Sequence, residues 1–424
     1  MSFESKEPSL ADICSDVSYG YTESATDEQV GPKFLRITDI QGGTFDWDAV
    51  PFCPATDANV IKYRLEIGDI VVARTGNSTG ENAQINKEPP SAVFASYLIR
   101  FRPDAKQVNP FFIGYQLRSD RFRQHVLAVR GGSAQPGANA KQLGAFPIRL
   151  IPRRLQDSAV EILRSIDDRI TLLRETNATL EAIAQAMFKS WFVDFDPVHA
   201  KQQGRTPEGM SEATAALFPD SFEDSEQGLV PRGWNYVSMK EVVSIFDSQR
   251  IPLAGQERDK RKGEYPYYGA AALMDYVDDY LFDGIYLLMG EDGSVVDEKG
   301  FPITQYVWGK IWVNNHAHIL QGKNGVSTEH LMLFLKGTNV QPYITGAVQA
   351  KISQSNMWRI MFLNPSREIS ESFGAVVEPL FARVRHNSEQ AQTLATLRDT
   401  LLPRLISGQL RLPEAEAALE EAIV

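Results

Sequence analysis

The residues of this chain that could do chemistry are few and widely spaced. Its six histidines are scattered, and only His316 and His318 lie close together, in the sequence HAH, with no third metal ligand near them in the sequence. At strand spacing the two rings would share one face, and a polar surface strand explains such a face better than a metal site does. No phosphate-binding loop of the form GxxxxGK(S/T) occurs. We therefore expect neither a metal nor a cofactor.

Two enzyme patterns come close to a match, and both fail. A nuclease pattern of PD followed by (D/E)xK would begin at Pro219, but neither glutamate after it has a lysine two residues later. The segment NPFF at Asn109 is similar to the (D/N/S)PP(Y/F) signature of enzymes that methylate a flipped base. Phe111 replaces the second proline, however, and no FxGxG cofactor loop occurs. Asn109 is better explained as a helix cap before Pro110, so we expect no catalytic activity from this chain by itself.

The distribution of charge indicates a nucleic-acid partner. The net charge is −11, which taken alone argues against DNA binding. Residues 100–154, however, contain eleven Lys or Arg and two acids, and residues 299–362 contain six Lys or Arg and one acid. The acids gather in residues 201–230 and at the C-terminal end. Blocks of charge are often only solvated faces, but two separate basic blocks favour DNA as a partner.

Three loops carry polar side chains of the kind that read bases. They are GDIVVARTGNSTGENAQ, RGGSAQPGANAKQLG and TGAVQAKISQSN, and the last two are expected to be counterparts. Arginine fits guanine, whereas Asn and Gln fit adenine and small hydroxyls suit either a base or a phosphate. The alternative for the first loop is a plain β-turn at Gly76 and Gly80. The candidate DNA-binding residues are Arg74, Thr75, Asn77, Thr79, Arg130, Ser133, Gln135, Asn139, Lys141, Thr345, Gln349 and Lys351.

The elements that position these loops are repeated in the sequence. TLEAIAQAMFKSW at Thr179 corresponds to TLATLRDTLLPRL at Thr393, 214 residues later, and SLADICSDV corresponds to SMKEVVSIF. In each half we expect strands (69–75 and 94–101, then 285–290 and 306–313) and a helical segment (NPFFIGYQLRSDRFRQHVL, then STEHLMLFLKGT). The pattern predicts two mixed α/β units, each followed by a helix.

Each of the two long helices has an apolar stripe with an asparagine near its middle. The stripes run at spacings of 3 and 4 residues, which is typical of helices that pack on each other as a coiled coil, and a buried Asn opposite another would fix their register. About thirty helical residues span roughly 45 Å, more than the roughly 34–36 Å of one turn of B-DNA. Such a pair would hold two DNA readers at a fixed separation. The residues expected to serve in helix pairing or subunit docking are Leu173, Asn177, Leu180, Met187, Phe188, Trp191, Phe192, Leu394 and Leu401.

The predicted fold is α+β, with two recognition domains in tandem separated by two long helices in an antiparallel coiled coil. The expected divisions are domain 1 (1–152), a first long helix (153–197), an acidic linker (198–230), domain 2 (231–364), a second long helix (365–412) and an acidic tail (413–424). Only Cys14 and Cys53 are present, and no long apolar run or secretory signal is visible, so we expect a cytoplasmic protein.

Specific motifs suggest a family. TLEAIAQAMFKSWFVDFDPVHAK, followed by GRTPEGMSEATAALFPDSFEDSEQGLVPRGW, resembles the central conserved region of the specificity (S) subunits of Type I restriction–modification enzymes. YPYYGAAALMDYVDDYLFDGIYLLMGEDGS, NNHAHIL and YITGAVQAKIS are similar to one type of target recognition domain, and FLRITDI and GSAQPGANAKQLGAFPI to another. On this resemblance, further residues are expected at the DNA interface, namely Arg36, Tyr268, Asn315 and His316. The segment AALMD after YYGA is less polar than is usual in the family.

The resemblance implies a division of labour. Each recognition domain would read half of a bipartite double-stranded DNA target, and the helices would set the spacer. Two modification (N6-adenine methyltransferase) subunits would dock on the chain, and restriction (ATP-dependent endonuclease and translocase) subunits would join them. Two alternatives stay open: the specificity chain of a restriction enzyme with fused cleavage and methylation subunits, and a structural adaptor that binds no DNA. The aromatic cluster at Phe188, Trp191, Phe192 and Phe195 is wider than two helices need, which predicts packing on a recognition domain or a docking surface.

Overall fold

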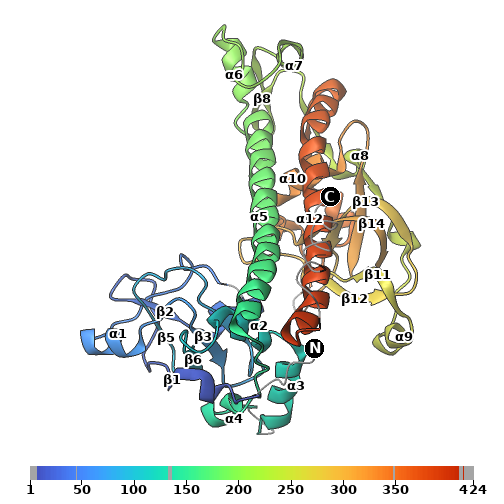
Figure 1. Ribbon diagram of the computed structural model, residues 1–424. Coiled ribbons are helices and arrows are strands. Elements are labelled where there is room, and N and C mark those ends of the chain that lie inside the picture. The colour runs from blue at the N-terminus through green and yellow to red at the C-terminus, as the bar shows by residue number, and fades with distance from the viewer. Residues whose placement is uncertain (1–6, 44, 132–135, 347–348, 410–413, 415–424) are drawn as a thin grey trace. The chain divides into compact units, whose positions relative to one another are not determined.

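The computed structural model describes residues 7–43, 45–131, 136–346, 349–409 and 414. It divides into two compact units, which we treat separately. Unit 1 comprises residues 1–172 and 390–424, and unit 2 comprises residues 173–389. Two long helices, α5 (Arg153–Phe192) and α12 (Arg367–Ile406), run through both units (green and orange to red in Figure 1). Each has 40 residues and lies within the bounds expected from the sequence, 153–197 and 365–412.

Unit 1 combines short strands with short helices. Its core lies around β3 (Ile70–Ala73), β5 (Ala92–Phe94) and the start of β6 (Leu98–Pro103), where Val71, Ala73, Phe94 and Leu98 are fully buried. Its strands are β1 (Cys14–Tyr19), β2 (Lys33–Leu35), β3 (Ile70–Ala73), β4 (Asn82–Gln84), β5 (Ala92–Phe94) and β6 (Leu98–Pro103). Its helices are η1 (Ala11–Ile13), η2 (Ile37–Gly43), α1 (Asp57–Tyr63), α2 (Pro110–Leu117), α3 (Asp120–Val129) and α4 (Ala140–Gly144).

Unit 2 is richer in strands. They are β7 (Phe222–Ser225), β8 (Gly228–Pro231), β9 (Asn235–Ser238), β10 (Val243–Ile245), β11 (Lys262–Tyr268), β12 (Leu273–Val277), β13 (Phe282–Gly290), β14 (Thr304–Val313), β15 (Ala317–Gly322) and β16 (Met361–Asn364). Its helices are α6 (Asp196–Gln202), α7 (Glu212–Leu217), α8 (Met239–Val242), η3 (Asp247–Gln249), α9 (Gly255–Lys260), α10 (Thr328–Lys336), η4 (Gln341–Tyr343) and α11 (Gln354–Met357).

The topology of the sheets confirms the internal repeat. The strand order is β1-β6-β3-β4 in unit 1 and β10-β15-β13-β14-β11-β12 in unit 2. All neighbours among the first four strands of each order pair antiparallel. A helix follows the second strand of each order, α2 after β6 and α10 after β15. Unit 2 adds the β11–β12 hairpin, which joins through the parallel pairing of β11 with β14. The same sheet plan therefore underlies both units.

The two long helices pack against each other in antiparallel directions within unit 2. Near the start of this part of α5, Asn177 Oδ1 accepts a 2.8 Å hydrogen bond from Asn387 Nδ2. Farther along α5, the ring of Trp191 lies 5.2 Å from that of Phe373, which comes earlier in α12. In unit 1 the first part of α5 is tied to the last part of α12, because Asp167 Oδ1 lies 2.8 Å from Arg398 NH1. The asparagines of the two stripes thus meet, as the spacing predicts.

The aromatic cluster at the end of α5 is core rather than a free surface. Phe188, Trp191 and Phe192 are buried, and they pack on Phe373, Phe218, Trp234 and the ring of His330. These contacts lie within unit 2, so the first of the two expected roles, packing on a recognition domain, accounts for the cluster. The docking role expected for Phe188, Trp191 and Phe192 is therefore not available to side chains buried in this way.

The segment predicted to be an acidic linker is folded. It contains α6, α7 and the β7–β8 hairpin. Its acids are mostly exposed, whereas Val198 and Phe218 are buried in the core of unit 2. The acidic composition gave no indication of these buried apolar residues, and the expectation of a linker was wrong in that respect. Across the part of the chain that the structure describes, no helix has both the length and the apolar character needed to cross a membrane.

A candidate nucleic-acid interface in each unit

In unit 1 two of the predicted loops come together. We define loop pair 1 as residues 74–76, which follow β3, together with residues 131 and 136–138, which follow α3. Its strand-like contacts join Thr75 to Gly137 and Gly131 to Gly137. The backbone N–H of Gly76 donates to the Pro136 carbonyl over 2.8 Å, and the N–H of Ala138 donates to the Arg74 carbonyl over 3.0 Å. A strand end and a distant loop are thus held as one surface.

Unit 2 contains the same arrangement. Loop pair 2 consists of residues 291–293, which follow β13, with residues 345 and 350–352, which follow η4. Bridges join Asp292 to Lys351 and Thr345 to Lys351. The N–H of Gly293 donates to the Ala350 carbonyl over 2.9 Å, and the N–H of Ile352 donates to the Glu291 carbonyl over 2.9 Å. Each contact of loop pair 1 therefore has its equivalent in loop pair 2.

The equivalence assigns each residue a counterpart. Arg74 corresponds to Glu291. The N–H of Arg74 donates to the Tyr97 carbonyl just before β6, and the N–H of Glu291 donates to the His316 carbonyl just before β15. Lys351 corresponds to Gly137, and both make a pair of backbone hydrogen bonds, with Thr345 and Gly131 respectively. The two loops that the sequence predicted to be counterparts thus correspond at these residues. Lys141 has no part in the correspondence, because it lies in the first turn of α4, beyond loop pair 1.

Arg74 is the best positioned cation of unit 1. Its Nε donates to the Ser96 carbonyl over 2.9 Å, and its guanidinium lies over the ring of Tyr19, 5.0 Å from the centroid. The Tyr19 hydroxyl in turn accepts from the N–H of Ala140 over 3.0 Å. The terminal guanidinium nitrogens of Arg74 make no hydrogen bond or ion pair with any described residue. A planar guanidinium fixed at Nε can offer two parallel donors to guanine.

The other candidates in unit 1 differ in what they can touch. Thr79 is 8% exposed, and its hydroxyl donates to the Gly76 carbonyl over 2.7 Å, so it holds the turn. Arg36 is committed to Asp39 through a 2.8 Å ion pair, which raises the pKa of its guanidinium. Asn139 caps α4 by accepting from the Gln142 N–H. Asn77, Arg130 and Lys141 are exposed, Thr75 is half-buried, and Ser133 and Gln135 lie outside the described residues.

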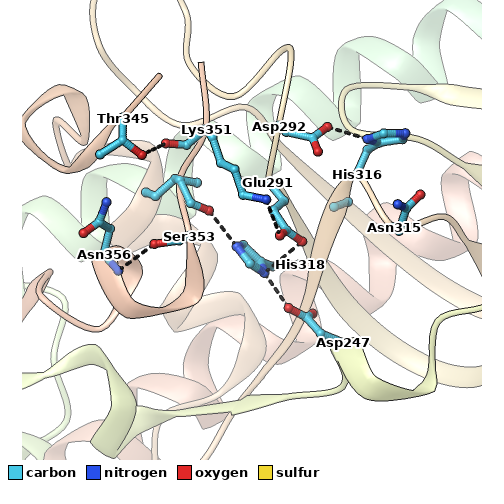
Figure 2. Close-up of polar contacts among 12 residues, drawn as sticks. Asp247, Glu291, Asp292, Asn315, His316, His318, Thr345, Lys351, Ser353 and Asn356 are labelled. Carbon is cyan, nitrogen blue, oxygen red and sulfur yellow. Dashed lines mark hydrogen bonds and ion pairs between the residues drawn. The ribbon is translucent and has the colours of Figure 1, made fainter. Parts of the chain in front are cut away.

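Loop pair 2 rests on a network of charged side chains, shown in Figure 2. The Glu291 carboxylate lies 2.8 Å from Arg250 NH1 and 3.3 Å from Lys351 Nζ. His318, only 1% exposed, is bound on both sides: Nδ1 lies 2.5 Å from Asp247 Oδ2, and Nε2 lies 2.9 Å from the Ile352 carbonyl. The network joins η3, β13 and β15 to residues 351 and 352. The network thereby holds residues 351 and 352 of loop pair 2 in place.

The donor set of this network resembles that of a metal site. Ligand atoms of Asp247, Glu291 and His318 lie within 4.8 Å of one another. The charge of the two carboxylates is already met by cations, because Arg250 contacts both of them and Lys351 contacts Glu291. A divalent ion placed there would face that guanidinium at close range. The geometry fits an ion-pair network better than it fits a metal.

The sequence interpretation of the two neighbouring histidines was wrong for one of them. His318 lies on β15 and is buried, whereas His316 precedes the strand and its side chain is 47% exposed. They do not share a surface face, because the strand begins only at Ala317. His316 instead contacts the Asp292 carboxylate through Nδ1. The buried ring therefore serves the network, and the exposed ring stays a candidate for contact with a ligand.

A hollow of about 440 Å³ lies beside His316 in unit 2. Its lining includes Asn315, His316, Arg258 and Met274. Tyr267, also in the lining, is almost fully buried and its hydroxyl accepts from the Leu253 N–H, so it holds the fold. Tyr268 is half-buried, and burial raises the pKa of its hydroxyl. The remaining candidates Asn315, Thr345 and Gln349 are exposed.

The first basic block is less available than the sequence suggested. Seven of its eleven cations form ion pairs within unit 1, for example Arg100 with Asp16 and Arg102 with Asp69. The others so paired are Arg118, Arg121, Arg123, Arg149 and Arg153. Two of the remaining four, Arg130 and Lys141, are exposed and lie close in sequence to loop pair 1. In unit 2, three residues that the sequence prediction left out support loop pair 2: Glu291, Arg250 and Asp247. Two are acids and the third is an isolated arginine, so none of them gave a DNA-binding signal.

Comparisons with known proteins agree with this architecture. The family described as Type I restriction modification DNA specificity domain matches residues 56–182 and again residues 231–392. The Type I restriction enzyme HindI specificity subunit of Haemophilus influenzae is 24% identical over 96% of this chain and 99% of its own length. The MjaIX specificity subunit of Methanocaldococcus jannaschii is 22% identical over 84% of this chain and 78% of its own.

A solved structure supports the fold. The S subunit of a Type I restriction–modification system from M. genitalium superposes with a TM-score of 0.55 at 14% identity, covering 95% of this chain and 96% of that one. At that identity the likeness concerns the fold alone. The family match is broader, because it falls twice and takes in parts of both units and of both long helices. The chain therefore belongs to the family of Type I restriction–modification DNA specificity subunits.

Proposed function

We propose that this chain recognises a bipartite double-stranded DNA target, with unit 1 reading one half-site and unit 2 the other. The observation that carries the proposal is the repetition of the loop pair. In both units a strand end is bonded to a loop that comes more than fifty residues later. Each pair also presents one cation held by fixed partners, Arg74 in unit 1 and Lys351 in unit 2. Positioned donors of this kind suit the edges of bases.

Exposed cations around the loop pairs would supply affinity for any DNA sequence. In unit 1 these are Arg130 and Lys141, and both are exposed. Phosphate contacts of this type give most of the sequence-independent binding and make it sensitive to salt. The base-reading groups would then choose among sequences. On this division, Arg74 and Lys351 determine specificity, whereas Arg130 and Lys141 determine affinity.

The helices are the proposed site for two modification (N6-adenine methyltransferase) subunits. Along α5, residues 176–188 contain a single charged residue, Glu181, which is paired with Lys336. The outward face of this stretch is small and apolar, and Ile183 is 45% exposed on it. Its other exposed members are Ala178, Thr179, Ala182 and Ala186. An uncharged exposed helix face suits another helix as its partner, and in this role it replaces the buried aromatic cluster.

We further infer that α5 and α12 set the spacer between the half-sites. Each helix is continuous from one unit into the other, so the length of the helix pair is set by the sequence itself. The paired asparagines fix the register of one helix on the other. Restriction subunits would join this assembly, since the relatives are named as specificity subunits of Type I restriction enzymes.

Selection from random DNA tests the proposal directly. The full chain would be purified together with a modification subunit and incubated with duplexes that carry a long randomised segment. Bound duplexes would be recovered over several rounds and sequenced. We expect one enriched motif with two specific halves and an unspecific spacer of constant length. A motif with a single specific half, or no enriched motif, would contradict the proposal. A chain acting only as a structural adaptor would give the second of these results.

A further inference from the structure

The equivalent positions Arg74 and Glu291 carry opposite charges. Both residues follow the third strand of the shared order, and both accept a backbone hydrogen bond from the opposite segment of their loop pair. Unit 1 therefore presents a guanidinium at the place where unit 2 has a carboxylate. A carboxylate at a DNA interface would repel phosphates unless its charge served another group. The question is what Glu291 does there.

The surroundings of Glu291 show which groups it serves. Its Oε2 faces Arg250 NH1 at 2.8 Å, and its Oε1 faces Lys351 Nζ at 3.3 Å (Figure 2). Arg250 is well buried and is also held by the Ala317 carbonyl, at 2.7 Å from its NH1. Its place is thus fixed without Lys351. The other carboxylate oxygen of Glu291, Oε1, is the one that contacts the lysine.

Lys351 is fixed at its backbone, and its side chain is exposed. Its N–H donates to the Thr345 carbonyl over 2.8 Å, and its own carbonyl accepts from the Thr345 N–H over 2.8 Å. The next residue, Ile352, is bonded on both sides, to Glu291 and to His318. The Lys351 side chain is nevertheless 47% exposed. Among the described residues, the ion pair with Glu291 is the contact that restrains its ammonium group.

We propose that Glu291 is a positioning residue that holds Lys351 for contact with a guanine in the half-site of unit 2. This inference rests on the proposed function. An ammonium group has three donors, so an ion pair on its Glu291 side leaves donors for the O6 and N7 acceptors of guanine. Without the carboxylate, the flexible lysine would turn to the nearest phosphate, which every sequence offers. Loop pair 2 thus obtains from two residues the restrained cation that loop pair 1 obtains from Arg74 alone.

The test compares base preferences of variants within the complex. The full chain with its modification subunits would be assayed on the selected bipartite target and on targets with each base pair replaced. For the wild type we expect at least one G·C pair in the half-site of unit 2 to be preferred about tenfold or more. Glu291→Gln should lose this preference and steepen the salt dependence of binding to unspecific DNA by about one phosphate contact, a change of roughly 0.9 in the logarithmic slope. The half-site of unit 1 should be read as before.

Three further variants separate positioning from folding. Lys351→Gln should lose the same G·C preference without the steeper salt dependence, and Glu291→Gln with Lys351→Gln should lose no more than either alone. Because the Lys351 side chain is exposed, its variant tests the proposal even where Glu291→Gln destabilises unit 2. Glu298→Gln makes the same change of charge at an exposed turn of unit 2 and should alter nothing.

The outcomes distinguish the two proposals. If the wild-type complex selects no bipartite target, the proposed function fails and this inference fails with it. If it selects one, but Lys351→Gln keeps every base preference in both half-sites, the inference alone is overturned. It is also overturned if Glu291→Gln weakens both half-sites equally or leaves the G·C preference intact, since a positioning residue of unit 2 must act on its own half-site.

Discussion

Asn387 Nδ2 donates a 2.8 Å hydrogen bond to Asn177 Oδ1, where the helix pair enters unit 2. Asn387 is completely buried, and Asn177 also donates to the Val384 carbonyl and to the Ser388 hydroxyl. Among the described residues, Asn387 Oδ1 is buried without a hydrogen-bond partner, so the hydrogen bond from Asn387 Nδ2 to Asn177 is what favours this register: a shift of either helix would leave a further buried polar group unpaired. The contact therefore specifies alignment more than it adds stability.

A double-mutant cycle tests this reading of the asparagine pair. Asn387→Leu should lower the free energy of unfolding by about 1–3 kcal/mol, because it leaves Asn177 Oδ1 without its donor. Combining it with Asn177→Leu should restore the stability or raise it above that of the wild type, because the polar groups are then both gone. Urea unfolding monitored by tryptophan fluorescence measures both. A double variant less stable than either single variant would contradict the role of the pair in register.

Arg74 should affect one half-site only. Arg74→Glu removes a cation that Ser96 and Tyr19 hold in place, so it should abolish recognition of the half-site read by unit 1 and leave the other preferences unchanged. Binding to targets mutated in one half-site at a time provides the measurement. Arg123→Glu serves as the control, because Arg123 is an exposed arginine of unit 1 in helix α3. Equal weakening of both half-sites by Arg74→Glu would count against the model of two independent readers.

The fold was more predictable than the interface, for physical reasons. Strands such as β3 and β13 have apolar β-branched sequences bounded by turn residues, and the long helices have stripes at spacings of 3 and 4. These are local patterns, and their recurrence after 214 residues showed the repeat. The folded state of residues 198–230 was missed, because it depends on a few apolar residues, such as Phe218, reaching a distant core.

The interface could be predicted only in part, because it is made of pairings between distant loops. Arg74 and Lys351 were identified from residue type alone, and both lie in the loop pairs. Glu291 could not be identified, since an acid gives no signal for DNA binding when its partners are unknown. Thr79 shows the opposite case. Its hydroxyl is of a type that suits DNA, but it already donates to the Gly76 carbonyl within its own turn. Residue type indicates what a side chain could bind, but only the fold shows which of its atoms are occupied.

The exposed face of α5 predicts a site of subunit assembly. Ile183→Glu places a charge on that uncharged face, so it should weaken association with the modification subunit at least tenfold while leaving the free energy of unfolding within about 0.5 kcal/mol of the wild type. Analytical ultracentrifugation of the mixed proteins measures association. The matched control is Ile61→Glu on helix α1 of unit 1, where the isoleucine is also exposed. If the two variants assembled equally well, the docking face would have to lie elsewhere.

His330 makes the stability of unit 2 depend on pH. Its ring is buried among Phe188, Phe192, Phe362 and Phe373, and among the described residues neither ring nitrogen has a hydrogen-bond partner. Burial lowers the pKa of this histidine from 6.5 to about 3, because the charged form would lose its hydration without gaining a partner. The folded chain thus keeps the ring neutral at a pH where the unfolded chain has bound a proton.

The direction of the pH effect follows from this difference in proton binding. Below pH 6.5 the unfolded state binds one proton more than the folded state, so the free energy of unfolding falls as the pH falls towards about 3. Between pH 7 and pH 5 this residue should cost about 2 kcal/mol. His330→Phe should remove that part of the pH dependence and raise stability at every pH, whereas the same change at the exposed His386 should leave the dependence as it is. Urea unfolding at several pH values measures the slope, and an unchanged slope in His330→Phe would show that the proton difference arises at another group.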